Sequence, residues 1–228
     1  YINVGIILHF SIMKEVIMKK LLFWMVLIVG IVALIGSCAK KDEETAAATT
    51  SVTTTTASGS ITVGSETLSG TYVSACNTTQ FAAAAGSNMF PSDVKSGKTV
   101  IVVTSDTTFS DEMLMYTDTS CSTPSAYTKN GNTSVTVGVA SGSNYLVTYN
   151  SSTYKINAYT AVALDNLTAA LIANISDIVL TLGEEYSTTG SSKSYKNLWS
   201  VTSTTIQTGN GDKNTQPTAI NSMVMTKE

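Results

Sequence analysis

Hydrophobic and polar residues alternate with a period of two over most of the chain beyond residue 60. β-Branched and aromatic residues are concentrated in the alternating stretches, and clusters of Gly, Asn, Ser and Asp separate them, as is typical of short β-strands joined by turns. Asn130-Gly131 is predicted to be one of these turns. The predicted strands cover residues 68–75, 98–104, 112–117, 134–139, 144–149, 154–162, 177–182 and 198–203. Many short strands at close spacing indicate an all-β fold, an antiparallel sandwich or barrel.

One stretch departs from this period. Apolar residues recur there at helical spacing, at Leu164, Leu167, Leu171 and Ile175. This spacing predicts one short helix over residues 165–174. Asp165 or Asn166 is expected to cap it, because a side-chain oxygen at that position can accept from a free N–H group of the first turn. We expect the helix to close one end of the β-structure.

A different hydrophobic pattern precedes the strands. Met18-Lys19-Lys20 begins a short basic segment, residues 21–35 are almost entirely apolar, and small residues follow. This succession is the pattern of a secretory signal peptide. An apolar run of roughly 18 residues is also long enough to span a bilayer as a retained helix, so a transmembrane anchor is the alternative.

The residues after the apolar run favour the signal peptide. Ile35, Gly36, Ser37 and Cys38 resemble the lipobox of bacterial lipoproteins. The resemblance implies that Ile35, Gly36 and Ser37 are recognised by a signal peptidase, and that Cys38 is acylated and becomes the first residue of the mature chain.

The chain is therefore expected to have four parts. Residues 1–17 precede a complete signal sequence and are expected to be an over-extended start, and they include His9, the only histidine. Residues 18–37 form the signal peptide. Residues 38–60 carry the lipidated cysteine and a flexible Thr-rich tether, whose composition cannot bury enough apolar area to fold. Residues 61–228 form the β-domain.

Charge limits the partners of the expected mature chain. Residues 38–228 hold ten lysines and fifteen acidic residues, and the chain has no arginine. Recognition of phosphate and nucleic acid depends on arginine forks and basic stripes. A nucleic-acid partner is therefore not expected.

Two cysteines remain once Cys38 is lipidated. An exported chain enters an oxidising compartment, in which an even pair of cysteines usually forms a bridge. A disulfide between Cys76 and Cys121 is therefore predicted. The alternative, a reactive thiol, lacks a histidine or arginine to lower its pKa.

Several short motifs resemble those of a group of uncharacterised bacterial lipoproteins. They are Gly70–Cys76, Tyr116–Pro124, Lys155–Asn157, Gly211–Ile220 and Met225–Lys227. The group looks lipocalin-like, which implies an antiparallel up-and-down β-barrel over about residues 68–228. The chain departs from the group at Gln216-Pro217, where Arg-Pro is usual, and it lacks a further Cys and Trp that relatives often carry.

A barrel of eight strands is just wide enough to be filled by side chains or to hold one small ligand. Met113 and Met115 share one strand face, and tyrosines combine an apolar body with a polar tip. The candidate ligand-lining residues are Met113, Met115, Tyr145, Tyr149, Tyr154 and Tyr159. The alternative is that these side chains only fill the core or lie outside.

Catalytic and metal-binding motifs are weak, and we expect neither an enzyme nor a cofactor or metal. Ser92–Lys95 has the Ser-x-x-Lys spacing of penicillin-binding enzymes, but its surroundings are β-rich. Asp111-Glu112 and Glu184-Glu185 are adjacent pairs, whose side chains point to opposite faces of a strand, and we interpret them as solvated hairpin ends. Asn210–Asn214 falls short of a calcium loop and is expected to be a turn.

Two functional classes remain. The first is a lipid-tethered barrel that binds a small apolar or amphipathic ligand, and the second is a structural or interaction protein of the cell envelope with a filled barrel. Ala39 implies the outer membrane by resemblance to the enterobacterial sorting rule. The charged residues 40–44 resemble export signals of surface lipoproteins, so both the periplasmic face and the cell surface stay open.

Overall fold

The computed structural model describes residues 55–87, 89–172, 178–189 and 193–228. The predicted signal peptide, the lipobox, Cys38 and most of the tether lie outside the described residues. Val52–Glu228 forms a compact unit by itself. Within the described ranges, neither helix is both long and apolar enough to cross a bilayer.

The described elements are mostly strands. In chain order they are β1 (Ile61–Val63), β2 (Glu66–Leu68), β3 (Thr71–Ser74), α2 (Thr78–Ala84), β4 (Ser96–Val103), β5 (Phe109–Tyr116), β6 (Pro124–Ser141), β7 (Asn144–Ala158), α3 (Ala161–Ile172), β8 (Tyr186–Thr189), β9 (Ser194–Val201), β10 (Thr205–Thr208) and β11 (Met225–Lys227).

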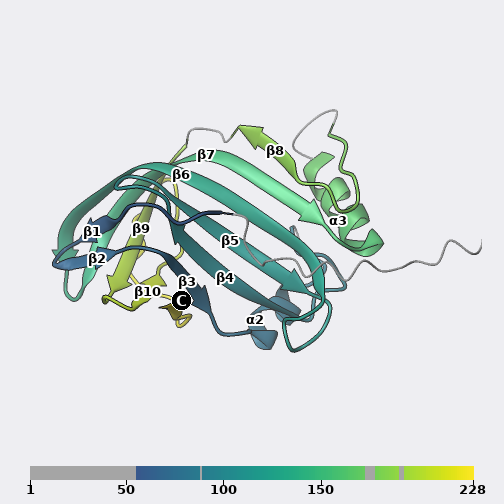
Figure 1. Ribbon diagram of the computed structural model, residues 1–228, viewed down its shortest axis with the longest axis horizontal. Helices are drawn as coiled ribbons and strands as arrows, with labels where there is room; N and C mark the ends of the chain where they lie inside the picture. Colours follow the sequence, from purple (N-terminus) through teal and green to yellow (C-terminus); the bar gives the residue numbers. More distant parts are fainter. Residues whose placement is uncertain (1–54, 88, 173–177, 190–192) are drawn as a thin grey trace, which may run out of the picture. The chain divides into compact units, whose positions relative to one another are not determined.

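Eight of these strands close into an antiparallel barrel (Figure 1). The order around the ring is β3, β4, β5, β6, β7, β9, β10 and β11, and each strand pairs with its neighbours in this order. Strand β11 pairs with β3 and so completes the ring. Strand β8 pairs with the second half of β7 and lies outside the ring, while β9 pairs with the first half of β7. The predicted all-β, up-and-down barrel is therefore confirmed.

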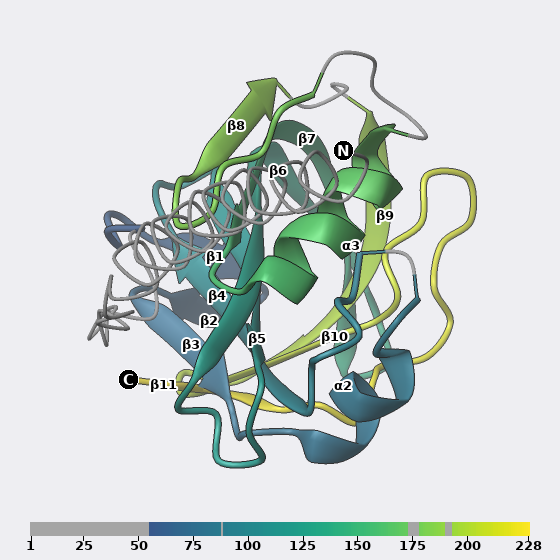
Figure 2. The same ribbon diagram turned by 90° about the vertical axis from the view of Figure 1, so that its right-hand side faces the viewer.

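Each end of the barrel interior is filled by apolar side chains. At the end where the β1–β2 hairpin lies, Ile61, Val63 and Leu68 join a buried cluster with Tyr72 and Trp199 of the barrel. At the other end, α2 and α3 contribute a second cluster, which includes Phe81 and Leu167 together with Met115 and Ile156 of the strands. Figure 1 shows the hairpin and the two helices at opposite ends, and Figure 2 looks onto the end that carries the helices.

Two glycines allow the side chains that fill the barrel ends to pack closely against the backbone. A Cβ on Gly97 of β4 would lie 2.1 Å from the Phe81 ring, and a Cβ on Gly64 of the hairpin turn would lie 2.0 Å from the Tyr145 hydroxyl. Real Cβ atoms do not approach other atoms so closely, so any larger residue would displace the aromatic ring.

The disulfide joins two segments on the outer face of the barrel. Cys76 follows β3, Cys121 lies in the turn between β5 and β6, and the two are bonded across a sequence separation of 45 residues. The Cys76–Cys121 prediction is confirmed. Both residues belong to an apolar cluster with Val100, Leu114 and Tyr127.

The strand predictions failed mainly around β6. Asn130-Gly131 is not a turn: it lies inside β6, where Gly131 pairs with Ser110 of β5 and Thr153 of β7. The hairpin turns instead at Gly142, whose φ of +66° suits glycine. Strand β7 is continuous where two strands were predicted. Of the strand predicted at 177–182, the described residues 178–182 form none.

The predicted short helix is confirmed as α3, but its start and its cap need correction. Helix α3 begins at Ala161, and its cap is Thr160, whose Oγ1 accepts from the Ala163 N–H at 3.0 Å. Neither Asp165 nor Asn166 caps it. Helix α2 was not predicted, because it is short; Asn77 caps it by accepting from the Gln80 N–H at 2.9 Å.

The last residues of the predicted tether contact the barrel. The Ser58 N–H donates to the Val103 carbonyl at 2.9 Å, and the Thr55 hydroxyl donates to Glu112 at 2.6 Å. Thr55 and Ser58 at the end of the predicted tether therefore hydrogen-bond to the barrel domain.

Candidate ligand-binding site in the barrel

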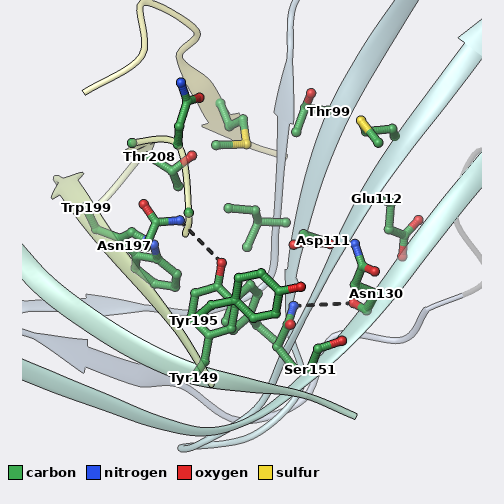
Figure 3. Close-up of a pocket in the computed structure, with 18 residues that line it drawn as sticks. Thr99, Asp111, Glu112, Asn130, Tyr149, Ser151, Tyr195, Asn197, Trp199 and Thr208 are labelled. Carbon is green, nitrogen blue, oxygen red and sulfur yellow. Dashed lines mark hydrogen bonds between the residues drawn. The ribbon is translucent and has the colours of Figure 1, made fainter. Parts of the chain in front are cut away.

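A cavity of about 470 Å³ lies inside the barrel between the two filled ends (Figure 3). It is lined from β4, β5, β6, β7, β9, β10 and β11 and the loop after β10, by Thr99, Ile101, Phe109, Asp111, Glu112, Met113, Asn130, Asn132, Tyr149, Ser151, Tyr195, Asn197, Trp199, Thr208, Gly209, Asn210, Gly211 and Met225. Ligand sites usually measure about 300 to 1,000 Å³, so the cavity can hold a small molecule.

Strand register determines which side chains meet in the cavity. Alternate residues of a strand share a face, so Phe109, Asp111 and Met113 of β5 all point inward. Asp111 lies opposite Asn130 of β6, and Tyr149 of β7 lies opposite Tyr195 of β9. The same alternation sends Glu112 to the opposite face of the sheet, where it pairs with Lys129 at 3.7 Å.

One wall of the cavity is aromatic. The Phe109 ring contacts Tyr149 and Trp199 edge to face, with ring centroids 5.0 and 5.2 Å apart. Tyr149 in turn stacks on Tyr195 at 5.9 Å. Each ring fixes its neighbour, so these four side chains form a continuous apolar surface for a ligand.

Another wall carries a carboxyl group. Asn130 Nδ2 donates to Asp111 Oδ1 at 2.6 Å, and Asp111 is only partly accessible. Burial raises the Asp111 pKa to about 6; hydrogen bonds from Asn130 and Asn132 oppose this rise, and the neighbouring charge of Glu112 adds to it. At neutral pH the carboxyl is thus largely ionised, in a place that disfavours its charge.

Tyr149 links the two walls. Asn197 Nδ2 donates to its hydroxyl oxygen at 3.4 Å. Burial raises the Tyr149 pKa to about 12, and the negative charge of Asp111 adds to the rise. Tyr149 therefore stays a neutral phenol at physiological pH, and its own O–H can donate.

Four buried side-chain polar atoms have no hydrogen-bond partner among the described residues. One of them, Trp199 Nε1, belongs to a residue that lines the cavity and is 1 % exposed. An indole N–H only donates, and a buried donor without an acceptor is costly. Because Trp199 lines the cavity, a ligand or water oxygen bound there would satisfy it.

The cavity reaches the surface beside the loop that follows β10. Asn210 and Gly211 line the cavity and are also exposed. A Cβ on Gly211 would lie 2.9 Å from the Tyr149 hydroxyl and 3.1 Å from Asn197 Nδ2. The absence of a side chain thus lets this loop approach the luminal polar groups closely.

The predicted ligand-lining residues are only partly brought together. Met113 and Tyr149 line the cavity. Met115 and Tyr154 pack in the cluster at the helical end, and Tyr145 packs in the cluster at the hairpin end. Tyr159 was wrongly placed by the prediction: it lies in the outer cluster, with its ring 6.1 Å from Tyr127.

Sequence reasoning missed the principal polar group of the site. Asp111 was interpreted as a solvated hairpin end, whereas it lies mid-strand in β5 with its side chain in the cavity. The opposite orientation of Asp111 and Glu112 was predicted correctly. Met113, a candidate lining residue, lies two positions from Asp111 on the same strand. Strand alternation therefore gave the signal that Asp111 lies on the luminal face.

The other motifs noted in the sequence lie in turns or form an ion pair in the structure. Ser92 lies in a turn before β4 and does not begin a helix. The Asp212 carboxylate accepts from the Asn214 and Thr215 N–H groups, which forms the expected turn and lowers its pKa. Glu185 pairs with Lys155 at 2.5 Å. Among the described residues, no group of three or more His, Cys, Asp or Glu side chains is arranged to hold a metal ion.

Comparison with known proteins gives no family for this chain. No protein-family model matches it, and no curated protein is significantly similar to it in sequence.

Proposed function

We propose that this protein is a lipid-anchored barrel of the bacterial cell envelope that binds a small amphipathic molecule in its lumen. The observation that carries the proposal is the cavity of about 470 Å³ between two filled ends of a closed barrel. A barrel with a purely structural role has no need of this space, because eight strands can be filled by side chains.

The chemistry of the cavity supports an amphipathic occupant. Phe109, Tyr149 and Trp199 offer an apolar surface, while Asp111 and Asn130 offer polar groups on another wall. Ligand sites typically combine an apolar lining with a few placed polar groups. The unpartnered Trp199 Nε1 adds a donor that an occupant can satisfy.

The envelope location rests on the sequence and on the disulfide. The lipobox at residues 35–38 lies outside the described residues, and its resemblance to lipoprotein signals supports anchoring through Cys38. Structural disulfides such as Cys76–Cys121 occur mainly in exported proteins. Both features favour the cell envelope, and Ala39 favours the outer membrane, with the domain on the periplasmic face or the cell surface.

Binding can be tested with Nile red, a neutral apolar dye. Trp199 is the one tryptophan of Val52–Glu228, so energy transfer from Trp199 to the dye reports occupancy of the lumen. We expect saturable binding of one dye per chain. Thr99→Phe adds a ring to a residue that lines the cavity and should abolish binding.

The matched control is Thr136→Phe, the same substitution on an exposed residue of β6. It should bind the dye as the unaltered domain does. Equal binding by both variants, or no saturable binding by the unaltered domain, would refute the luminal site.

A further inference from the structure

We propose that the ligand of the luminal cavity carries a positively charged amine, which pairs with Asp111, and an apolar body, which lies against the aromatic wall. This inference rests on the proposed binding function and specifies its ligand class.

The first argument is the charge of the lining. The lining includes two acidic residues and no Lys, Arg or His. The Asp111 side chain faces the cavity, whereas the Glu112 carboxylate pairs with Lys129 on the other face of the sheet. The groups that hydrogen-bond Asp111 are all neutral: the side-chain amides of Asn130 and Asn132 and the Asn130 backbone N–H. A carboxylate has about four acceptor sites, so these three donors leave room for a further donor from the cavity.

The second argument is the cost of an unpaired carboxylate in this place. The raised Asp111 pKa has burial as its main cause, which means that the surroundings disfavour the negative charge. A cation beside Asp111 would remove this cost, and charge-assisted hydrogen bonds are the stronger ones. An anionic ligand would instead meet a like charge, so the lumen disfavours fatty acids and phosphate esters.

The third argument is the aromatic wall. The Lys213 ammonium already lies 5.6 Å from the centroid of the Tyr195 ring. Tyr149 stacks on Tyr195 and lies near enough to Asp111 for its pKa to respond to that carboxylate. Electron-rich rings attract cations, so Asp111 and Tyr149 together favour an ammonium group between them.

The test uses three probes with the same octyl chain: octylamine, 1-octanol and octanoate. Val52–Glu228 is titrated with each at pH 7.5, and Trp199 fluorescence and calorimetry give the dissociation constants. We expect octylamine to bind about 10- to 100-fold more tightly than 1-octanol, as one charged hydrogen bond allows, and octanoate to bind most weakly.

Two variants assign the preference to one carboxyl. Asp111→Asn keeps the shape and removes the charge, and it should bring octylamine to within about threefold of 1-octanol. Asp106→Asn makes the same change at an exposed residue of the β4–β5 turn and should keep the full preference. The comparison of probes on the unaltered domain remains decisive if Asp111→Asn does not fold.

The outcomes separate the two proposals. Equal binding of all three probes, or a preference for octanoate, overturns the amine inference and leaves a luminal binding protein. A preference for octylamine that survives Asp111→Asn also overturns it. If none of the probes and no Nile red binds, the proposed function itself fails, and this inference fails with it.

Discussion

Removing the Cys76–Cys121 disulfide should destabilise the barrel by an amount that its loop length sets. The bond closes a loop of 45 residues, which in the chain-entropy model restricts the unfolded chain by about 4 kcal/mol at 25 °C. The bond lies in an outer apolar cluster, away from the cavity. The double variant Cys76→Ala/Cys121→Ala should therefore lose stability and keep its ligand site.

Urea unfolding of Val52–Glu228, followed by Trp199 fluorescence, measures the effect. With a slope of about 2 kcal/mol per M urea, a loss of about 4 kcal/mol lowers the midpoint by about 2 M. Reduction of the unaltered domain is the matched control and should produce the same midpoint. The double variant should not respond to reductant.

A midpoint that falls by less than about 0.5 M, equivalent to about 1 kcal/mol at that slope, would refute the chain-entropy reasoning. Loss of Nile red binding by a folded double variant would contradict the separation of disulfide and cavity.

Three further predictions follow from single contacts. Gly97→Ala should destabilise the barrel by about 1 to 3 kcal/mol, because its Cβ would meet the Phe81 ring at 2.1 Å. Gly138→Ala makes only ordinary contacts and should be tolerated. Equal urea midpoints for the two variants would contradict the close packing of Phe81 against Gly97. Thr160→Ala should cost about 1 to 2 kcal/mol, because it removes the α3 cap and the hydrogen bond that the Thr160 hydroxyl donates to Asp93. Thr168→Ala within the helix should cost nothing, and equal thermal unfolding midpoints for the two variants would contradict the cap. The folded-state pKa of Asp111 is raised to about 6, so the folded protein binds its proton more tightly than the unfolded chain does. Stability relative to Asp111→Asn should therefore fall by up to about 3 kcal/mol as pH rises from 4 to 7; a difference that stays constant or grows in favour of the unaltered domain would show that Asp111 is not held in a place that disfavours its charge.

The closed barrel was predictable because many of its strands are rich in β-branched and aromatic residues and are separated by turn residues. Strands such as β4, with Val100–Val103 buried, carry enough β-branched residues to be recognised without tertiary context. The disulfide was predictable from cysteine count and expected compartment. These are local or compositional properties, and they do not depend on which strand faces inward.

The failures cluster at the cavity. Asn130-Gly131 has the composition of a turn, yet it lies inside β6, because Asn130 faces a polar cavity and bonds Asp111 across the strand pair. A strand that lines a partly polar lumen lacks an alternating apolar face, so the pattern used to find strands is missing there. Asp111 was misplaced for the same reason. Departures from local rules are expected where a fold carries a site.

The most direct test of luminal binding is native mass spectrometry of Val52–Glu228, produced in an oxidising compartment and sprayed without denaturant. We predict a folded domain with its disulfide intact that retains one small molecule, and a Thr99→Phe variant of the same fold that retains none. An intact, folded domain that carries no molecule after purification and retains neither Nile red nor octylamine when they are added would contradict the account.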